Sequence, residues 1–193
     1  MSTYFVGFTS RLHPAAESYF PPLSPPKNYK TSEAISGWLE RANEDRQSEA
    51  AMHPIVGSVC EVVVLDEAGQ QRLLAGGPHL PAGVAAQSFA EFVAEAARMA
   101  VSPLRLIGFR IADLVRMAAL ESAARGCILP FDMIGNERVL FDPYRRCIHE
   151  PARSSVDLRG FLRHLGLEPT DAAMTTAAGT AHSARLAAMR MGM

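Results

Sequence analysis

Asp113 is the acidic residue whose surroundings most suggest chemistry. It follows the apolar run Leu104 to Phe109 and lies in the first turn of a predicted helix that ends near Arg125, with Gly126 as its C-terminal cap. A strand that runs straight into a helix is the corner at which α/β folds present chemistry. Asp113 is therefore the candidate catalytic residue. The alternative is a structural role, in which its charge complements the helix dipole by about 0.3–1 kcal/mol.

Arginines form the second group of candidates. Residues 138 to 163 contain six arginines against three acids, and Tyr144 lies among them. Arginines with an interleaved aromatic side chain are typical of surfaces that bind the phosphates and bases of single-stranded nucleic acid. A solvated face with internal ion pairs explains the same pattern, and both interpretations stay open. The predicted nucleic-acid-binding residues are Arg110, Arg138, Tyr144, Arg145 and Arg146.

Cysteine and histidine give a weaker signal. Three residues are possible metal ligands, namely Cys127, Cys147 and His149, but they lack the paired spacing of zinc sites. Buried cysteines and a surface histidine are the expected outcome. No P-loop, dinucleotide fingerprint or Gly-x-Ser-x-Gly motif is present, so the common nucleotide-binding and serine-hydrolase chemistries have no support.

Composition indicates an ordinary globular protein. The chain has 193 residues, of which 48% are hydrophobic and 20% charged, and a formal net charge of −1. That charge provides no general attraction to nucleic acid or membranes, so any such binding must come from a local patch. No apolar run approaches the roughly 20 residues of a membrane helix. Three cysteines without CxxC spacing favour a reducing compartment, so we expect a cytoplasmic bacterial protein that does not bind membranes.

The predicted elements alternate between strand and helix patterns. Strands are expected at 3–9, at 53–66 and just after the Asp66–Gly69 turn, and again at 104–109; helices are expected from about 31, at 88–99, 113–125 and 155–165. Ser88 and Glu91 have the spacing of a capping box. Residues 127–151 are expected to form a loop and a hairpin that turns at Asp142–Arg145.

The domain is expected to span residues 1–167, with a proline-rich insertion at 14–30. Residues 168–193 are poor in large apolar side chains and are predicted to be a mobile C-terminal tail. Three consecutive strands, then a helix that crosses to a strand beside the first, is the ribonuclease H-like order. The predicted fold class is therefore α/β, a ribonuclease H-like mixed sheet flanked by helices.

Four segments in this order resemble the DEDD (DnaQ-like) superfamily of 3′–5′ exonucleases, in particular bacterial stand-alone proteins similar to the exonuclease domain of family B DNA polymerases. The segments are FVGFTS, HPIVGSV, LIGFRIADL and SSVDLRGFL, and the resemblance covers about residues 3 to 166. It implies an ancestral site in which four carboxylates hold two Mg²⁺ or Mn²⁺ ions for phosphodiester hydrolysis.

The resemblance also implies that this site is degenerate. Gly7 and Thr9 occupy the positions of the first Asp and Glu of the family. Asp113 matches the second acid, although the segment before it is shorter. Asp157 matches an Asp-Leu element that is not a metal ligand, and Asp171 has no upstream Tyr to complete the last motif. At most one of the four ligands is retained.

The first hypothesis is accordingly a catalytically degenerate exonuclease-like domain that needs no cofactor and serves as a binding or scaffolding module for single-stranded nucleic acid or a protein partner. The alternative is a divergent 3′–5′ exonuclease dependent on Mg²⁺ or Mn²⁺, using Asp113, Asp157 and acids supplied by a partner chain. A third hypothesis is a structural subunit whose proline-rich segment and tail dock on a larger assembly.

Overall fold

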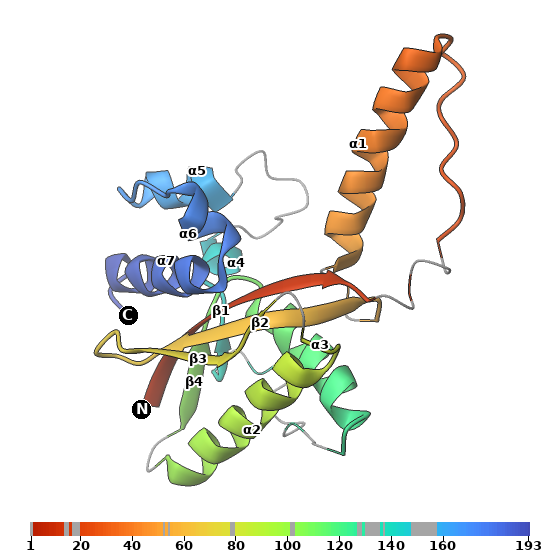
Figure 1. Cartoon of the computed structure of the whole chain (residues 1–193). Coiled ribbons are helices and arrows are strands. Elements are labelled where there is room, and N and C mark those ends of the chain that lie inside the picture. The colour runs from red at the N-terminus through yellow and green to blue at the C-terminus, as the bar shows by residue number, and fades with distance from the viewer. Residues whose placement is uncertain are drawn as a thin grey trace.

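A mixed β-sheet forms the centre of the molecule (Figure 1). The computed structural model describes residues 2–13, 16, 20–51, 53, 55–77, 80–100, 103–126, 129, 136, 138–147 and 158–193. In this part of the chain the sheet has five strands in the order β3-β2-β1-β4-β5. They are β1 (Ser2–Leu12), β2 (Gly57–Leu65), β3 (Gln71–Ala75), β4 (Leu104–Ile107) and β5 (Leu140–Phe141).

The pairing of the strands confirms the predicted fold class. β2 pairs antiparallel with both β1 and β3, whereas β4 pairs parallel with β1 and β5. The three strands that come first in the chain thus form a meander, and the chain crosses over through a helix to reach β4. This is an α/β fold with a mixed sheet in the ribonuclease H-like order.

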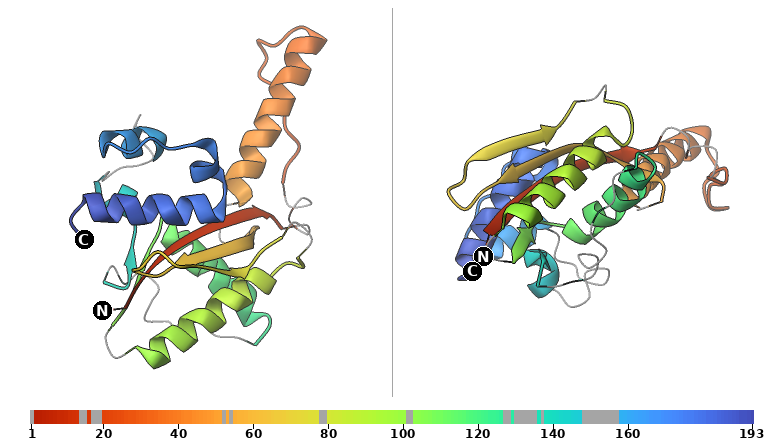
Figure 2. Two further views of the ribbon diagram at one scale, coloured as in Figure 1. Left: turned by 60° about the vertical axis from the view of Figure 1, so that its left-hand side comes forward. Right: turned by 90° about the horizontal axis from the view of Figure 1, so that it is seen from below.

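Helices cover both faces of the sheet (Figures 1 and 2). On one face lie α2 (Val84–Met99) and α3 (Ile111–Ala123). The opposite face is covered by α7 (Ala177–Arg190), with α4 (Pro143–Cys147), α5 (Leu158–His164) and α6 (Asp171–Thr175) beside it. The remaining helix, α1 (Ser32–Ala51), projects from the body, and residues 20–31 run alongside it. Trp38 of α1 is half-buried, with its ring 6.3 Å from that of Tyr29.

Side chains of β1 alternate between two apolar layers because neighbouring residues of a strand point to opposite faces. Val6 and Phe8 join the larger core with α2 and α3. Phe5 joins a smaller core with Val63 of β2 and with the alanines of α7. Because both faces are buried, β1 carries an unbroken apolar run, which is the pattern that predicted a buried strand.

The predicted mobile tail at 168–193 is wrong. Residues 171–175 and 177–190 are helical, and the hydroxyls of Thr170 and Thr176 cap the two helices by accepting from the backbone N–H groups of Ala173 and Gly179. α7 buries small side chains on two sides: Ala177, Ala181 and Ala188 pack against the sheet, and Ala184 and Ala187 pack against Phe109 and α5. Small residues let the helix backbone come close to the strands, so the helix needs no large apolar side chains.

Two local boundaries also differ from the sequence predictions. α2 begins at Val84, after Gly83 in a left-handed conformation (φ 84°), so the Ser88–Glu91 capping box lies inside the helix and does not start it. The predicted hairpin turn at Asp142–Arg145 is instead the start of α4. Pro143 fits the first turn of a helix, and the Asp142 carboxylate accepts from the backbone N–H groups of Tyr144 and Arg145.

Candidate functional site

The metal site that the resemblance implies would lie where α7 crosses β1, because Gly7 shares with Phe5 the face of β1 that α7 covers. Here the helix backbone rests directly on Gly7. A Cβ atom at position 7 would overlap the carbonyl oxygen of Ala177, and it would lie 2.5 Å from the backbone nitrogen of Ala181 and from Oγ1 of Thr180. An aspartate therefore cannot occupy position 7 in this packing.

Apolar side chains fill the space next to this contact. Phe109, just after β4, packs in one buried cluster with Phe161 and Leu162 of α5 and with Ala184 and Ala187 of α7. Among the described residues, no group of three or more His, Cys, Asp or Glu side chains could hold a metal ion. The position that the resemblance assigned to the two metals is occupied by packed backbone and hydrocarbon.

Asp171, another acid that the resemblance considers, belongs to no metal-binding group among the described residues. Asp171 lies in the first turn of α6 with its side chain 87% exposed, and it pairs with Arg159 of α5. Asp157, Cys127 and His149 lie outside the described residues. Cys60 and Cys147 are free thiols; burial, partly offset by Arg11, raises the pKa of the Cys60 thiol, which disfavours the thiolate.

Asp113 is buried at the start of α3 and surrounded by guanidinium groups. Its carboxylate lies 2.9 Å from Nε of Arg110, 3.5 Å from Nη2 of Arg145 and 3.7 Å from Nη1 of Arg116. Arg110 adopts a left-handed backbone conformation (φ 55°), the only non-glycine among the described residues with positive φ. A carboxylate that pairs with three arginines supports the structural interpretation of Asp113.

Asp142 lies just before α4 and contacts both α4 and the corner between β4 and α3. Its side chain accepts from the backbone N–H of Arg110 at 2.7 Å, and from the backbone N–H groups of Tyr144 and Arg145 at 3.0 and 3.2 Å. It thus connects the start of α4 to the β4–α3 corner. Burial raises the pKa of the Asp142 carboxyl, although the three backbone donors and Arg145 act in the opposite direction.

The raised pKa of Asp142 predicts that the free energy of unfolding depends on pH. Because the folded-state pKa is raised above the ordinary 3.8, the folded protein holds the proton more tightly than the unfolded chain does. Residue 142 therefore favours folding most at acid pH, and this contribution is lost as the pH rises through the raised pKa. Asp142→Asn keeps one acceptor oxygen and removes the titration.

The expected result is that Asp142→Asn gains stability relative to the wild type as the pH increases. Urea unfolding of both proteins from about pH 4 to about pH 8 measures the difference. A difference in the free energy of unfolding that stays flat, or that turns against Asp142→Asn as the pH rises, would contradict the assignment.

A cavity of about 820 Å³ lies at the β4–β5 edge of the sheet. Its described lining contains five arginines and one acid, Asp142, in a chain whose net charge is −1; Asp113, which is not in the lining, pairs with two of the five, Arg116 and Arg145. The arginines come from four places in the fold: Arg105 of β4, Arg116 of α3, Arg138 just before β5, and Arg145 and Arg146 of α4. We call this the arginine cavity.

The arginine cavity brings together part of the predicted nucleic-acid-binding set. Arg138, Arg145 and Arg146 line it. Tyr144 does not; its ring packs edge-on against Phe161 at 5.5 Å, beside a buried cluster. Arg110 lies outside the lining and pairs with Asp113. Tyr144 is thus a packing residue in this structure and not an exposed stacking platform.

Arg105 and Arg116 were missed by the sequence reasoning. Arg105 interrupts the apolar strand Leu104–Ile107, and an isolated charge in a buried strand was the available signal. Its guanidinium carbon lies 5.0 Å from the ring centroid of Phe141, and its Nε is buried without a hydrogen-bond partner in the described part of the chain. Arg116 lies one helical turn after Asp113, which is the spacing of an intrahelical pair.

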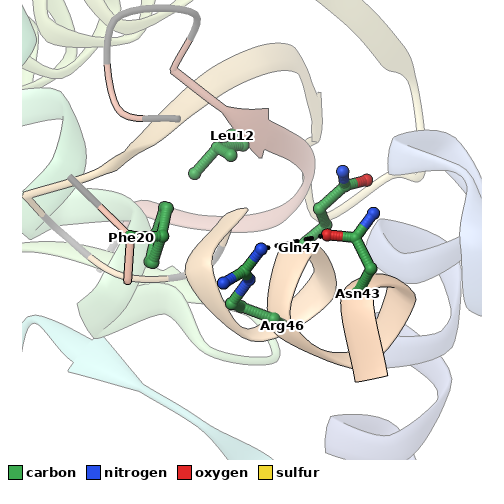
Figure 3. A pocket seen from close by; sticks show the side chains of 5 residues that line it. All are labelled: Leu12, Phe20, Asn43, Arg46 and Gln47. Atoms are coloured by element: carbon green, nitrogen blue, oxygen red, sulfur yellow. Dashed lines mark hydrogen bonds between the residues drawn. The ribbon is translucent and has the colours of Figure 1, made fainter. Parts of the chain in front are cut away.

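A second cavity, of about 270 Å³, lies at the base of α1 and is lined by Leu12, Phe20, Asn43, Arg46 and Gln47 (Figure 3). Its charged residue already has partners. Arg46 donates to the carbonyl of Pro21 at 2.8 Å and to Oδ1 of Asn43 at 3.2 Å, and its guanidinium lies 5.3 Å from the ring centroid of Phe20. Arg46 therefore fastens the proline-rich segment to α1, and this cavity is not a strong candidate for a ligand.

No protein-family model, curated protein or solved structure matches this chain. Of the helices that the structure describes, none has the length and apolar character needed to cross a membrane.

Proposed function

We propose that this protein is a catalytically degenerate 3′–5′ exonuclease-like domain that binds single-stranded nucleic acid without hydrolysing it. The arginine cavity is the observation that carries the proposal. The excess of arginines over acids in its lining provides the phosphate attraction that the chain as a whole, at −1, lacks.

The contact between α7 and Gly7 supports the proposed lack of hydrolysis. Two-metal catalysis needs carboxylates on β1, and the helix backbone leaves no room for a side chain at position 7. Asp113, the one matching acid, is engaged by three arginines. The proposed binding activity needs no metal.

The charges of the cavity favour nucleic acid over a protein partner. Arg138 and Arg146 are exposed, and neither has an ion-pair partner among the described residues. Guanidinium groups without an ion-pair partner in the described part of the chain suit the regularly spaced phosphates of a strand.

The test is the binding of a labelled oligothymidylate by wild type and by Arg138→Gln/Arg146→Gln, over a range of salt concentrations. The double variant is expected to bind at least about tenfold more weakly. Its slope of log affinity against log salt should fall by about 1.4, because each phosphate contact on a single strand contributes about 0.7.

The matched control is Arg41→Gln/Arg98→Gln, which removes two exposed arginines from α1 and α2. It changes the net charge equally and should leave binding nearly intact. Equal weakening in both double variants would show that binding depends on the net charge of the protein and not on the arginine cavity. No binding by the wild type would favour the protein-scaffolding hypothesis.

A nuclease assay with Mn²⁺ tests the other half of the proposal. Labelled single-stranded DNA and RNA should remain intact with wild type and with Asp113→Asn. Degradation by the wild type that Asp113→Asn abolishes would instead establish the divergent exonuclease.

A further inference from the structure

The wall of the arginine cavity is more specialised than phosphate binding alone requires. Besides its arginines, it is lined by Ile111, Val139, Leu140 and Phe141, and Arg105 stands over the ring of Phe141. At about 820 Å³ the cavity falls within the roughly 300–1,000 Å³ typical of small-molecule sites. An apolar floor with a cationic border fits a ligand that is part planar ring and part anion.

We infer that the arginine cavity is a nucleotide subsite, in which a base stacks beside the Arg105–Phe141 pair while its phosphate binds Arg138 and Arg146. Bases stack on guanidinium planes as well as on aromatic rings. The cation–π contact with Phe141 holds the Arg105 guanidinium in place, so the stacking surface is formed before the ligand arrives. This inference rests on the proposed function in one respect, namely that the bound nucleotide is part of a nucleic-acid strand.

The electrostatics of Arg105 support an anionic ligand. Arg105 is half-buried, and within the described residues no carboxylate pairs with it. A partly desolvated guanidinium without a counter-charge is unfavourable, and a phosphate in the same cavity offsets that cost. Arg116 and Arg145, which also line the cavity, are already shared with Asp113, so the unpaired Arg138 and Arg146 are the better phosphate ligands.

The subsite does not overlap the position beside Gly7 that the resemblance gives to the metals, although two of its arginines, Arg116 and Arg145, pair with Asp113. That position lies where α7 covers Gly7 of β1, whereas the arginine cavity lies beyond β4 at the β5 edge, two strands along the sheet. α7 is not among the elements that line the cavity. Closure of the one region by α7 therefore leaves the other available for a ligand.

Calorimetric titration with AMP, ribose 5-phosphate and adenosine tests the inference on the full chain. AMP should bind, and each fragment should bind at least about tenfold more weakly, because each lacks one of the two contacts. Arg105→Gln and Phe141→Leu should each weaken AMP about tenfold, and Arg138→Gln/Arg146→Gln should weaken it at least as much. Thermal unfolding of each variant confirms that it is folded, and Arg98→Gln serves as the control.

The outcomes separate the subsite from strand binding. Ribose 5-phosphate that binds as tightly as AMP, or AMP affinity unchanged in folded Arg105→Gln and Phe141→Leu, would overturn the subsite. An oligonucleotide that binds but is not displaced by AMP would also overturn it, while the proposed function would stand. AMP binding without oligonucleotide binding would preserve the subsite and contradict the proposed function.

Discussion

Gly7→Ala is expected to destabilise the protein by about 3 kcal/mol or more, or to prevent folding. Overpacking in a core costs about 1–3 kcal/mol when side chains can adjust. Here the new methyl group would meet the backbone of Ala177 and Ala181, which cannot move unless α7 itself shifts away from β1. Chemical unfolding, followed by circular dichroism, measures the loss.

Gly37→Ala is the matched control for this prediction. Gly37 lies within α1, where an added Cβ would meet only Nη1 of Arg41, at an ordinary 3.8 Å. Alanine in a helix interior should stabilise the protein by about 0.5–1 kcal/mol. If Gly7→Ala proved as stable as the wild type, the close contact between α7 and β1 would be wrong, and with it the argument against a metal site.

The double variant Gly7→Asp/Thr9→Glu tests whether acids at these two positions can form a metal site beneath α7. Restoring the two family acids should not create Mn²⁺-dependent nuclease activity, because the carboxylates would have to displace α7. A folded double variant that degraded single-stranded DNA would show that the contact between α7 and β1 does not exclude a metal site.

Removal of residues 168–193 is expected to abolish cooperative unfolding. Without α7, the sheet face formed by Phe5, Val63, Leu65 and Ile107 would be exposed to water. Phe109 and Phe161 would lose the alanines that they pack against. Large apolar areas exposed together destabilise the fold and favour aggregation, so the fragment 1–167 should be insoluble or molten.

Soluble yield and the urea unfolding transition of fragment 1–167 test this expectation. A matched truncation removes only Gly192 and Met193, which follow the last turn of α7, and should change the free energy of unfolding by less than about 0.5 kcal/mol. A fragment 1–167 that unfolds as cooperatively as the full chain would mean that residues 168–193 are the mobile tail that their composition suggests.

α7 occupies the face of β1 on which the resemblance would place metal-binding carboxylates. A helix that rests on the β1 backbone fills the volume that metals and carboxylates would otherwise need. The absence of a side chain at Gly7 and the small side chains of Ala177 and Ala181 make that contact possible. The arginine cavity, at the other end of the strand order from β3, is unaffected by this contact.

The sequence alone determined the order of the elements from β1 to α3 and the mixed character of the sheet. The apolar runs at β1, β2 and β4, the turn at Asp66–Gly69 and the stripe on α2 are local patterns, and local patterns are what periodicity reports. The position of Asp113 at a strand-to-helix corner was also predictable, because the residues that build the corner adjoin it in the chain.

Only the tertiary structure decided which residues of the candidate site meet. The arginine cavity unites Arg105, Arg116 and Arg138 from separate elements, and no spacing in the sequence relates them. The burial of Tyr144 depends on Phe161 of α5 in the same way. The docking of α7 depends on Gly7, some 170 residues earlier in the chain. An alanine-rich helix carries little hydrophobic signal of its own, and its burial is decided by how closely a distant backbone allows it to approach.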